Sequence, residues 1–471
     1  MISGRVPSMI DIFITFTIAR LLEHHPLGIY GQLPSRREGR LRRDLNFDTH
    51  YLFWHISQYG SSQMPHRLAK HSGIMFSAIT VANLLAYLFH AYMGRTLGPA
   101  EYGILGSLLA AFYVLSIPLG AVSTIVTKFV SEFKARQEYG KIASILFSAM
   151  KRLSRYAILI FIGVSLSSWL IADFLRISSP LPVILMGLLS AFAIILSIPR
   201  GVLRGLQNFG QLGLNISLEA LIRLLLGVLL VSVGLGVSGA ILAYGLGYLA
   251  ATFLALTPLS FLFRVRNETI DLSRIYKFSP PALTMSVCLA AMTNVDLIFV
   301  KHFFTSEEAG VYTVASVLGK VIFFVTMALT TPMFPLVSEL HTRGENTLSI
   351  LRKSSIYVIL FSGIVLAVYW LFPSFIINTL FGPAYLPAAP LLGTFGIAMG
   401  LIAVVMVYTT YLLAVKNMGF IKVLLGCTLL QIVLLLLFHR TLLQVLHVLI
   451  LANGLALFLL LLSRLKIRQR T

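Results

Sequence analysis

Long, nearly uninterrupted apolar runs separated by short polar turns are the feature that most constrains this chain. One run covers residues 104–126 and follows the polar turn Arg95–Tyr102. About twenty apolar residues in a helix, rising 1.5 Å each, cross a hydrocarbon layer roughly 30 Å thick. Similar runs recur to the end of the chain, whereas the strands of a membrane β-barrel alternate in polarity. The sequence therefore predicts an all-α polytopic membrane protein.

The composition agrees with this prediction and bears on the choice of partners. Of the 471 residues, 57% are hydrophobic and 11% are charged, against about 25% charged residues in soluble domains. The net charge of +20 is carried by basic residues that mostly flank the apolar runs. Orientation in a lipid bilayer explains this placement, so we expect no nucleic-acid partner. Cys288 and Cys427 lie within apolar runs, where they are expected to pack as small hydrophobic side chains.

We expect about 12 transmembrane helices in two parallel six-helix lobes around a central cavity. Six helices fall at 73–93, 104–126, 156–175, 181–199, 213–234 and 237–262, and six at 280–300, 310–334, 355–377, 387–413, 423–439 and 443–463. The predicted domains are an N-terminal extension (1–63), an N-terminal lobe (64–263), a basic cytoplasmic loop (264–279) and a C-terminal lobe (280–471).

The distribution of Lys and Arg predicts the orientation of these helices. With twelve spans, the connections on one side of the membrane contain most of the basic residues, such as Lys151, Arg152 and Arg155 in one connection alone. The turns on the other side contain only four: Arg95, Arg176, Lys301 and Arg440. By the positive-inside rule, both termini lie in the cytoplasm and the protein is a multi-pass protein of the cell membrane.

Two short sequence echoes indicate that the chain is duplicated. Glu101-Tyr102-Gly103 recurs as Glu308-Ala309-Gly310, and Val130-Ser131-Glu132 recurs at the same offset as Val337-Ser338-Glu339. An even number of spans in each half keeps both halves in the same orientation. The sequence therefore predicts a parallel repeat about an axis along the membrane normal.

Residues 1–63 do not share the pattern of the rest. Their apolar run, Ser8–Leu22, contains Asp11 and is too short to cross a bilayer. With the basic segment Ser35–Asp44, it is either an interfacial anchor or an upstream extension ahead of a start at Met64. We expect the second, because a short basic leader follows Met64 directly before the first span.

Ionisable residues within the spans are candidates for function because they are costly there. Glu219 and Arg223 are spaced i, i+4 and can pair on one helix face, either as packing or as part of a watery cavity. Asp296 and Lys320 either pair between two successive spans or stay available to a cavity. His90, near the end of the first span, is expected to be an ordinary interfacial histidine.

Four segments are similar to those of a known protein family: Gly94–Gly103, Pro199–Gly210, Val295–Ser316 and Met333–Leu340. They resemble the Wzx-type lipid-linked oligosaccharide flippases, the polysaccharide biosynthesis proteins of the multidrug/oligosaccharidyl-lipid/polysaccharide exporter superfamily. The resemblance extends from Met64 to the C-terminus. It implies two six-helix lobes around a cavity, and movement of a polyprenyl-phosphate-linked glycan from the cytoplasmic to the outer leaflet by alternating access.

A substrate of this class would need cations for its phosphate group and an energy source for its transport. Charge-assisted hydrogen bonds from Arg or Lys suit a phosphate, and the candidates are Arg223, Lys320, Arg95, Arg200 and Arg204, with Glu219 orienting Arg223. A solvated loop is the competing interpretation of Arg200 and Arg204. We expect no cofactor. Coupling to a Na⁺ or H⁺ gradient would involve the polar groups Asp296, Asn294, Gln431 and Asn453.

Two other functions remain open at this point. A cation-coupled multidrug exporter of the same superfamily would favour an acidic cavity, which the charges within these spans do not indicate. A membrane glycan ligase or glycosyltransferase would need a large external loop or a carboxylate cluster, and the turns opposite the basic loops are short. We therefore expect a transporter and not an enzyme. Its expected partners are the lipid bilayer, the lipid-linked glycan and glycan assembly enzymes.

Overall fold

The computed structural model describes residues 63–266, 268, 280–342 and 345–468, and these residues form an all-helical protein. Apart from Gln63, the predicted N-terminal extension lies outside the described residues, and so does most of the predicted inter-lobe loop. The unit Pro65–Thr471 is considered by itself below.

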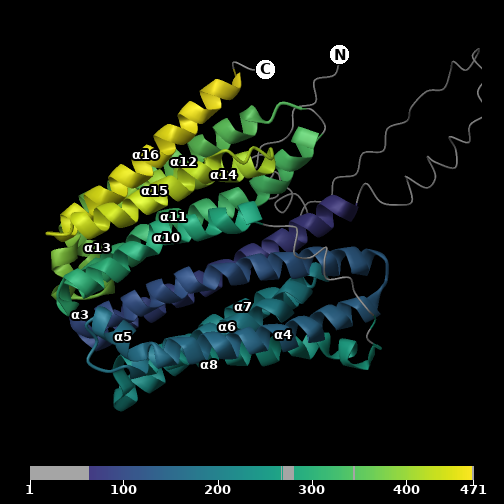
Figure 1. Ribbon diagram of the computed structural model, residues 1–471, viewed down its shortest axis with the longest axis horizontal. Coiled ribbons are helices and arrows are strands. Elements are labelled where there is room, and N and C mark those ends of the chain that lie inside the picture. The colour runs from purple at the N-terminus through teal and green to yellow at the C-terminus, as the bar shows by residue number, and fades with distance from the viewer. Residues whose placement is uncertain (1–62, 267, 269–279, 343–344, 469–471) are drawn as a thin grey trace, which may run out of the picture. The chain divides into compact units, whose positions relative to one another are not determined.

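The N-lobe contains the helices of the first half of the chain, and it forms a bundle in Figure 1. In this bundle α6 packs on both α4 and α8, and α7 packs on α8. The elements are α3 (Gln63–Ala135), α4 (Tyr139–Leu166), α5 (Ser168–Phe174), α6 (Leu181–Gly205), α7 (Phe209–Leu230), the short π-helical turn η1 (Val231–Leu235), α8 (Gly236–Leu256) and the 3₁₀ segment η2 (Thr257–Arg264).

The C-lobe contains the helices of the second half, in which α14 packs on α11, α12 and α16. Its elements are α10 (Pro280–Phe303), α11 (Ser306–Thr342), α12 (Leu348–Leu371), α13 (Pro373–Leu380), the 3₁₀ segment η3 (Pro383–Ala388), α14 (Ala389–Ala414), α15 (Phe420–Leu437) and α16 (Leu442–Arg468).

Glycine breaks account for the number of spans. Among the described residues, nine helices are long and apolar enough to cross a membrane, or ten if α4 and α5, which are bent by 57°, count as one span. Two of the nine turn back at a glycine with positive φ, Gly98 in α3 (φ 71°) and Gly234 after α7 (φ 90°). Glycine adopts this backbone conformation readily because it has no Cβ. With α4 and α5 counted as one span and each of these two helices divided at its glycine, the described residues contain the expected twelve spans.

Successive helices alternate in direction, so their connections gather at two faces of the bundle. We call one the turn face, and it carries the breaks at Gly98 and Gly234 with the short connections 175–180, 304–305 and 438–441. We call the other the loop face, and it carries the connections 136–138, 206–208 and 415–419.

The buried apolar residues show where the two lobes are joined. One cluster contains Phe89, Tyr102 and Tyr244 from the turn-face half of the N-lobe together with Phe381 and Tyr385 from the C-lobe. The loop-face half of the N-lobe has a separate cluster that includes Val130, Leu146, Leu203 and Leu259. The shared core therefore lies toward the turn face.

Candidate functional site

A cavity of about 250 Å³ lies between the lobes, with walls from both halves of α3, from α7 and from α10 and α11. Most of its lining surface is apolar. The lining residues with charged, amide, imidazole or hydroxyl groups are Asn83, Tyr87, His90, Tyr113, Glu219, Arg223, Asn294, Thr313, Ser316 and Lys320. The cavity therefore brings Arg223 of one lobe and Lys320 of the other, predicted separately from the sequence, to a single site.

Arg223 is held by its own helix and by an aromatic ring. Its Nη1 donates to Glu219 Oε1 at 2.9 Å, which is the i, i+4 pair that the sequence predicts on α7. The guanidinium carbon lies 4.5 Å from the centre of the Tyr244 ring, a cation–π distance. Arg223 Nε is buried and has no partner among the described residues. An anion in the cavity would satisfy this donor.

Arg200 and Arg204, on α6, extend the positive charge from the cavity toward the loop face. Arg200 donates to Asn215 Oδ1 at 2.8 Å and to Glu219 Oε2 at 3.4 Å, so a single carboxylate lies between two guanidinium groups. Arg204 Nη1 donates to Ser123 Oγ at 3.4 Å. Both arginines line a second hollow of about 220 Å³ within the N-lobe. Three arginines and one glutamate leave this wall with a net positive charge.

Lys320 bonds to an amide and not to a carboxylate. Its Nζ donates to Asn294 Oδ1 at 2.9 Å. Asp296 is fully buried in the C-lobe, where its Oδ2 accepts a hydrogen bond from the Tyr312 hydroxyl at 2.7 Å. The structure therefore does not contain the direct pair of Asp296 and Lys320, which was one of the two interpretations of these residues. The ammonium group faces the cavity without a bonded anion.

His90 and Ser316 line the cavity although the sequence analysis gave them no role there. His90 Nδ1 lies 3.1 Å from the Tyr102 hydroxyl, and Ser316 Oγ is buried with no partner among the described residues. Ser316 and Lys320 are spaced i, i+4, so both lie on one face of α11. This spacing is the sequence pattern from which Ser316 could have been predicted to line the cavity. Nothing in the local sequence separates His90 from an ordinary interfacial histidine.

Arg95 lies outside this cavity, at a contact between the lobes on the turn face. Its Nε donates to the Leu380 carbonyl at 3.1 Å, and its Nη2 donates to the Thr379 carbonyl. Beside it, the Tyr385 hydroxyl donates to the Gly94 carbonyl at 2.6 Å. The structure thus places Arg95 in a contact that holds the two lobes together.

The repeated Glu-x-Gly motifs meet at the same contact. A Cβ on Gly103 would lie 2.5 Å from the Ser306 carbonyl oxygen and 2.6 Å from the Gly310 backbone nitrogen. A Cβ on Gly310 would in turn collide with the Pro99 backbone. The two lobes therefore touch backbone to backbone at the turn face, through glycines that occupy equivalent positions in the two halves.

The four residues considered for cation coupling do not all lie at the central cavity. Asn294 faces the central cavity with Lys320, while Asp296, Gln431 and Asn453 lie on α10, α15 and α16 inside the C-lobe. One oxygen of each of these three, Oδ1, Oε1 and Oδ1, is buried without a partner among the described residues. No group of three or more His, Cys, Asp or Glu side chains suited to a metal ion occurs in the described part of the chain.

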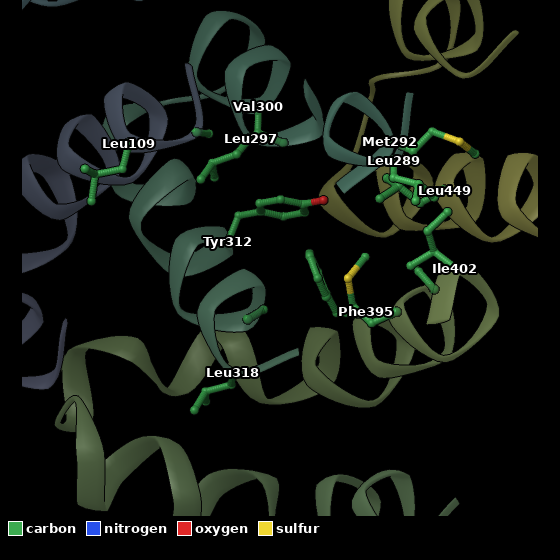
Figure 2. Packing of buried hydrophobic residues seen from close by; sticks show 14 of the residues in the cluster. Leu109, Leu289, Met292, Leu297, Val300, Tyr312, Leu318, Phe395, Ile402 and Leu449 are labelled. Atoms are coloured by element: carbon green, nitrogen blue, oxygen red, sulfur yellow. The ribbon is translucent and has the colours of Figure 1, made fainter. Parts of the chain in front are cut away.

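Packing around Tyr312 shows how the interior of the C-lobe is built. Figure 2 shows its ring between Leu297 and Phe395, with the hydroxyl directed toward the side of Met292. Gln431 Nε2 donates to the Met292 carbonyl at 3.1 Å, and Asn453 Nδ2 donates to the Ala398 carbonyl at 3.0 Å. The side-chain amides are therefore fixed by their N–H groups, and their oxygens stay available.

Comparison with known proteins agrees with this architecture. Among the solved structures, the fold matches an inward-facing multidrug resistance MATE family transporter of the MOP superfamily, with a TM-score of 0.69 at 12% identity over 84% of this chain and 98% of that one. It also matches the lipid II flippase MurJ in an inward closed conformation, with a TM-score of 0.62 at 14% identity over 82% and 86% of the two chains. These likenesses show the fold.

Sequence comparison shows the family. An uncharacterized membrane protein of Methanocaldococcus jannaschii is 24% identical over 318 residues, which are 64% of this chain and 71% of that protein. Residues 68–341 match the family model described as polysaccharide biosynthesis protein. The match confirms the resemblance found in the sequence, and the family and its structural neighbours are transporters or flippases. The chain is a multi-pass membrane transporter or flippase, and it belongs to the polysaccharide biosynthesis protein family.

Proposed function

We propose that the protein flips a polyprenyl-phosphate-linked oligosaccharide across the membrane by alternating access, for assembly of a surface polysaccharide or a glycoprotein glycan. The observation that carries the proposal is that Arg223 and Lys320, which belong to different lobes, line the same cavity. Cations in an apolar surrounding attract a phosphate more strongly than they do in water. An anion between them would draw the lobes together and would be released when the lobes rearrange.

The route to the cavity is supported by the arginines of α6. Arg204 lies near the loop-face end of this helix, Arg200 lies one turn deeper, and Arg223 follows in the cavity. A phosphate entering from the loop face would meet these cations in turn, while the isoprenoid tail stays in the bilayer. The turn-face contacts of Arg95 and Tyr385 close the opposite end in this conformation.

We further propose that the loop face is cytoplasmic, that both termini lie in the cytoplasm and that the protein works in the cell membrane. The excess of Lys and Arg in the loop-face connections supports this orientation. Glycan assembly enzymes on the cytoplasmic side are the proposed suppliers of the substrate.

Energy coupling through the C-lobe is a separate part of the proposal. Asp296, Gln431 and Asn453 each hold an unpartnered buried oxygen. Oxygen ligands suit a hard cation such as Na⁺, and a buried carboxylate suits a proton. Since Asp296 bonds to Tyr312 on α11, the helix that carries Lys320, binding of a cation or a proton at Asp296 would act directly on a wall of the cavity.

Transport by cavity variants tests the main proposal. In proteoliposomes loaded with a fluorescent polyprenyl-pyrophosphate oligosaccharide, we expect Arg223→Ala or Lys320→Ala to slow flipping by about 10-fold to 150-fold. This range corresponds to the loss of about 1.5–3 kcal/mol from a hydrogen bond to a charged group. Lys320→Arg keeps the charge and retains more activity. Arg352→Ala, at an exposed position on the loop side of α12, is the matched control for loss of one cation.

The outcome also separates flipping from drug export. Wild-type flipping by the Arg223→Ala, Lys320→Ala double variant in folded, inserted protein would overturn the mechanism. A multidrug exporter would move a cationic dye such as ethidium against its gradient. We expect no such transport, because Glu219, the one carboxylate among the described residues that line the cavity, is already paired with two arginines.

A further inference from the structure

His90 of α3 lines the central cavity at the end nearer the turn face. Along its own helix it is closer to the turn-face end than Arg223 or Lys320 is along theirs. One ring nitrogen is already bonded, because Nδ1 lies 3.1 Å from the Tyr102 hydroxyl. Tyr102 is fully buried, and its ring centre lies 5.9 Å from that of Tyr385. Tyr102 therefore fixes the imidazole and leaves its Nε2, which has no hydrogen bond to a described residue, for a ligand.

The imidazole is the group of this cavity that ordinarily changes its charge near neutral pH. Glutamate, arginine and lysine are ordinarily charged at pH 7 and tyrosine is neutral, whereas histidine titrates between about pH 5 and about pH 8. The other titratable groups that line the cavity, among the described residues, are Tyr87, Tyr113, Glu219, Arg223 and Lys320, and Tyr102 contacts the ring from the turn-face side.

The charges around His90 oppose a proton on it until an anion binds. Arg223 and Lys320 line the same cavity of about 250 Å³, and the described lining carboxylate, Glu219, is bonded to Arg223 and to Arg200. Like charges in an apolar surrounding repel strongly, so a third cation here is disfavoured. A phosphate between Arg223 and Lys320 would cancel this repulsion. It would also offer an acceptor oxygen to a protonated imidazole, and charge-assisted hydrogen bonds of this kind are strong.

We propose that His90 is a third anion-binding residue of the central cavity, which takes up a proton from solution when a phosphate group binds between Arg223 and Lys320. With both ring nitrogens protonated, Nδ1 donates to the Tyr102 hydroxyl oxygen and Nε2 donates to a phosphate oxygen. The proton returns to solution when the anion leaves. The inference rests on the proposed flipping function and adds to it that substrate binding is stronger at acidic pH and carries a proton with it.

Calorimetric titration of the purified full-length protein tests the proposal. The probe is N-acetylglucosaminyl farnesyl diphosphate, a diester without a group that titrates near neutral pH, so any proton taken up belongs to the protein. Titrations at the same pH in two buffers of different protonation enthalpy give the number of protons. We expect about one proton per bound diphosphate, and an affinity that falls by up to about tenfold per pH unit between about pH 6 and about pH 8.

Variants of His90 assign the proton. His90→Asn keeps an N–H group near the position of Nδ1 but cannot be protonated, and we expect both the uptake and the pH dependence to be lost. His90→Gln is a second neutral variant with the same expected result. His447→Asn, at an exposed position on α16 outside the cavity lining, is the matched control and should take up a proton as wild type does.

The outcomes separate this inference from the proposed function. Proton uptake by His90→Asn equal to that of the wild-type protein would overturn the inference. If that uptake were instead lost in Lys320→Arg, whose charge is permanent, the proton would belong to Lys320. Diphosphate binding that Arg223→Ala leaves unchanged, or no binding by the wild-type protein, would overturn the proposed function and this inference with it. Loss of proton uptake in His90→Asn with diphosphate still bound would support both.

Discussion

Substitution of Gly103 by alanine is expected to open the turn face. In the structure a Cβ at this position would lie 2.5 Å from the Ser306 carbonyl oxygen and 2.6 Å from the Gly310 nitrogen. Both of these atoms belong to the backbone of the other lobe, so neither can move away as a flexible side chain would. Because Gly103 lies within a helix, where alanine is favoured over glycine, the substitution leaves the N-lobe itself intact. The strain falls on the contact between the lobes.

The size of the effect follows from this geometry. Forcing one extra carbon into a close-packed contact costs about 1–3 kcal/mol. If this cost applies only when the lobes touch at the turn face, the equilibrium shifts from the closed to the open turn face by about fivefold to about 160-fold. A transporter that alternates between the two states would then spend most of its time open on this face, and its transport rate would fall.

Distance measurements across the turn face can detect the shift. Spin labels on Leu181→Cys of α6 and Leu443→Cys of α16, two exposed positions in different lobes, would report the separation by double electron–electron resonance. The two native cysteines, Cys288 and Cys427, are buried and would be replaced by alanine. We expect Gly103→Ala to populate longer distances.

The control is a glycine with free space around it. A Cβ on Gly163 of α4 would meet no atom within 4 Å, so Gly163→Ala is expected to leave the distances unchanged. Identical distance distributions for the two variants would refute the view that backbone contact through the repeated glycines holds the turn face closed.

Three further predictions concern the same closed state, the coupling site and the orientation. Tyr385→Phe removes the hydrogen bond to the Gly94 carbonyl, which contributes about 1 kcal/mol. The same spin labels should show an increase of about fivefold in the ratio of open to closed turn face, and an unchanged ratio would mean that the bond has no role in closure. Asp296→Asn removes the buried carboxylate, so flipping should lose its dependence on an imposed Na⁺ or proton gradient; a retained dependence would return Asp296 to a structural role. Reporter fusions after Glu138 should lie in the cytoplasm and fusions after Glu307 outside. A cytoplasmic signal at Glu307 would contradict the prediction that an odd number of spans precedes this residue.

Much of the fold is encoded in local sequence patterns. Apolar runs of about twenty residues must form helices in a bilayer, because lipid offers no partner for backbone N–H and C=O groups. The membrane-spanning helices could therefore be predicted before the structure was known. The i, i+4 pair of Glu219 and Arg223 could also be predicted, because helix geometry alone brings the two side chains together.

The candidate site depended on contacts between distant parts of the chain. Sequence alone marks Arg95, Arg223 and Lys320 as costly or unusual charges, but not which of them share a cavity. The tertiary structure places Arg223 and Lys320 on one cavity and Arg95 in a lobe contact at the turn face. It also brings His90 to the cavity wall, although its local sequence is that of an ordinary interfacial residue.

The repeated glycines illustrate the division between sequence and structure. The echo of Gly103 in Gly310 is visible in the sequence and indicates duplication. That the two glycines meet each other across the lobes is decided by how the halves pack. The sequence by itself determined the membrane-spanning helices, their order and the charges placed among them, because these follow from hydrophobicity and helix geometry within each segment. Only the tertiary structure decided which charges share a site and which surfaces touch, because those contacts join residues far apart in the chain, such as Gly103 with Gly310 and Arg95 with Leu380, and depend on the packing of whole lobes.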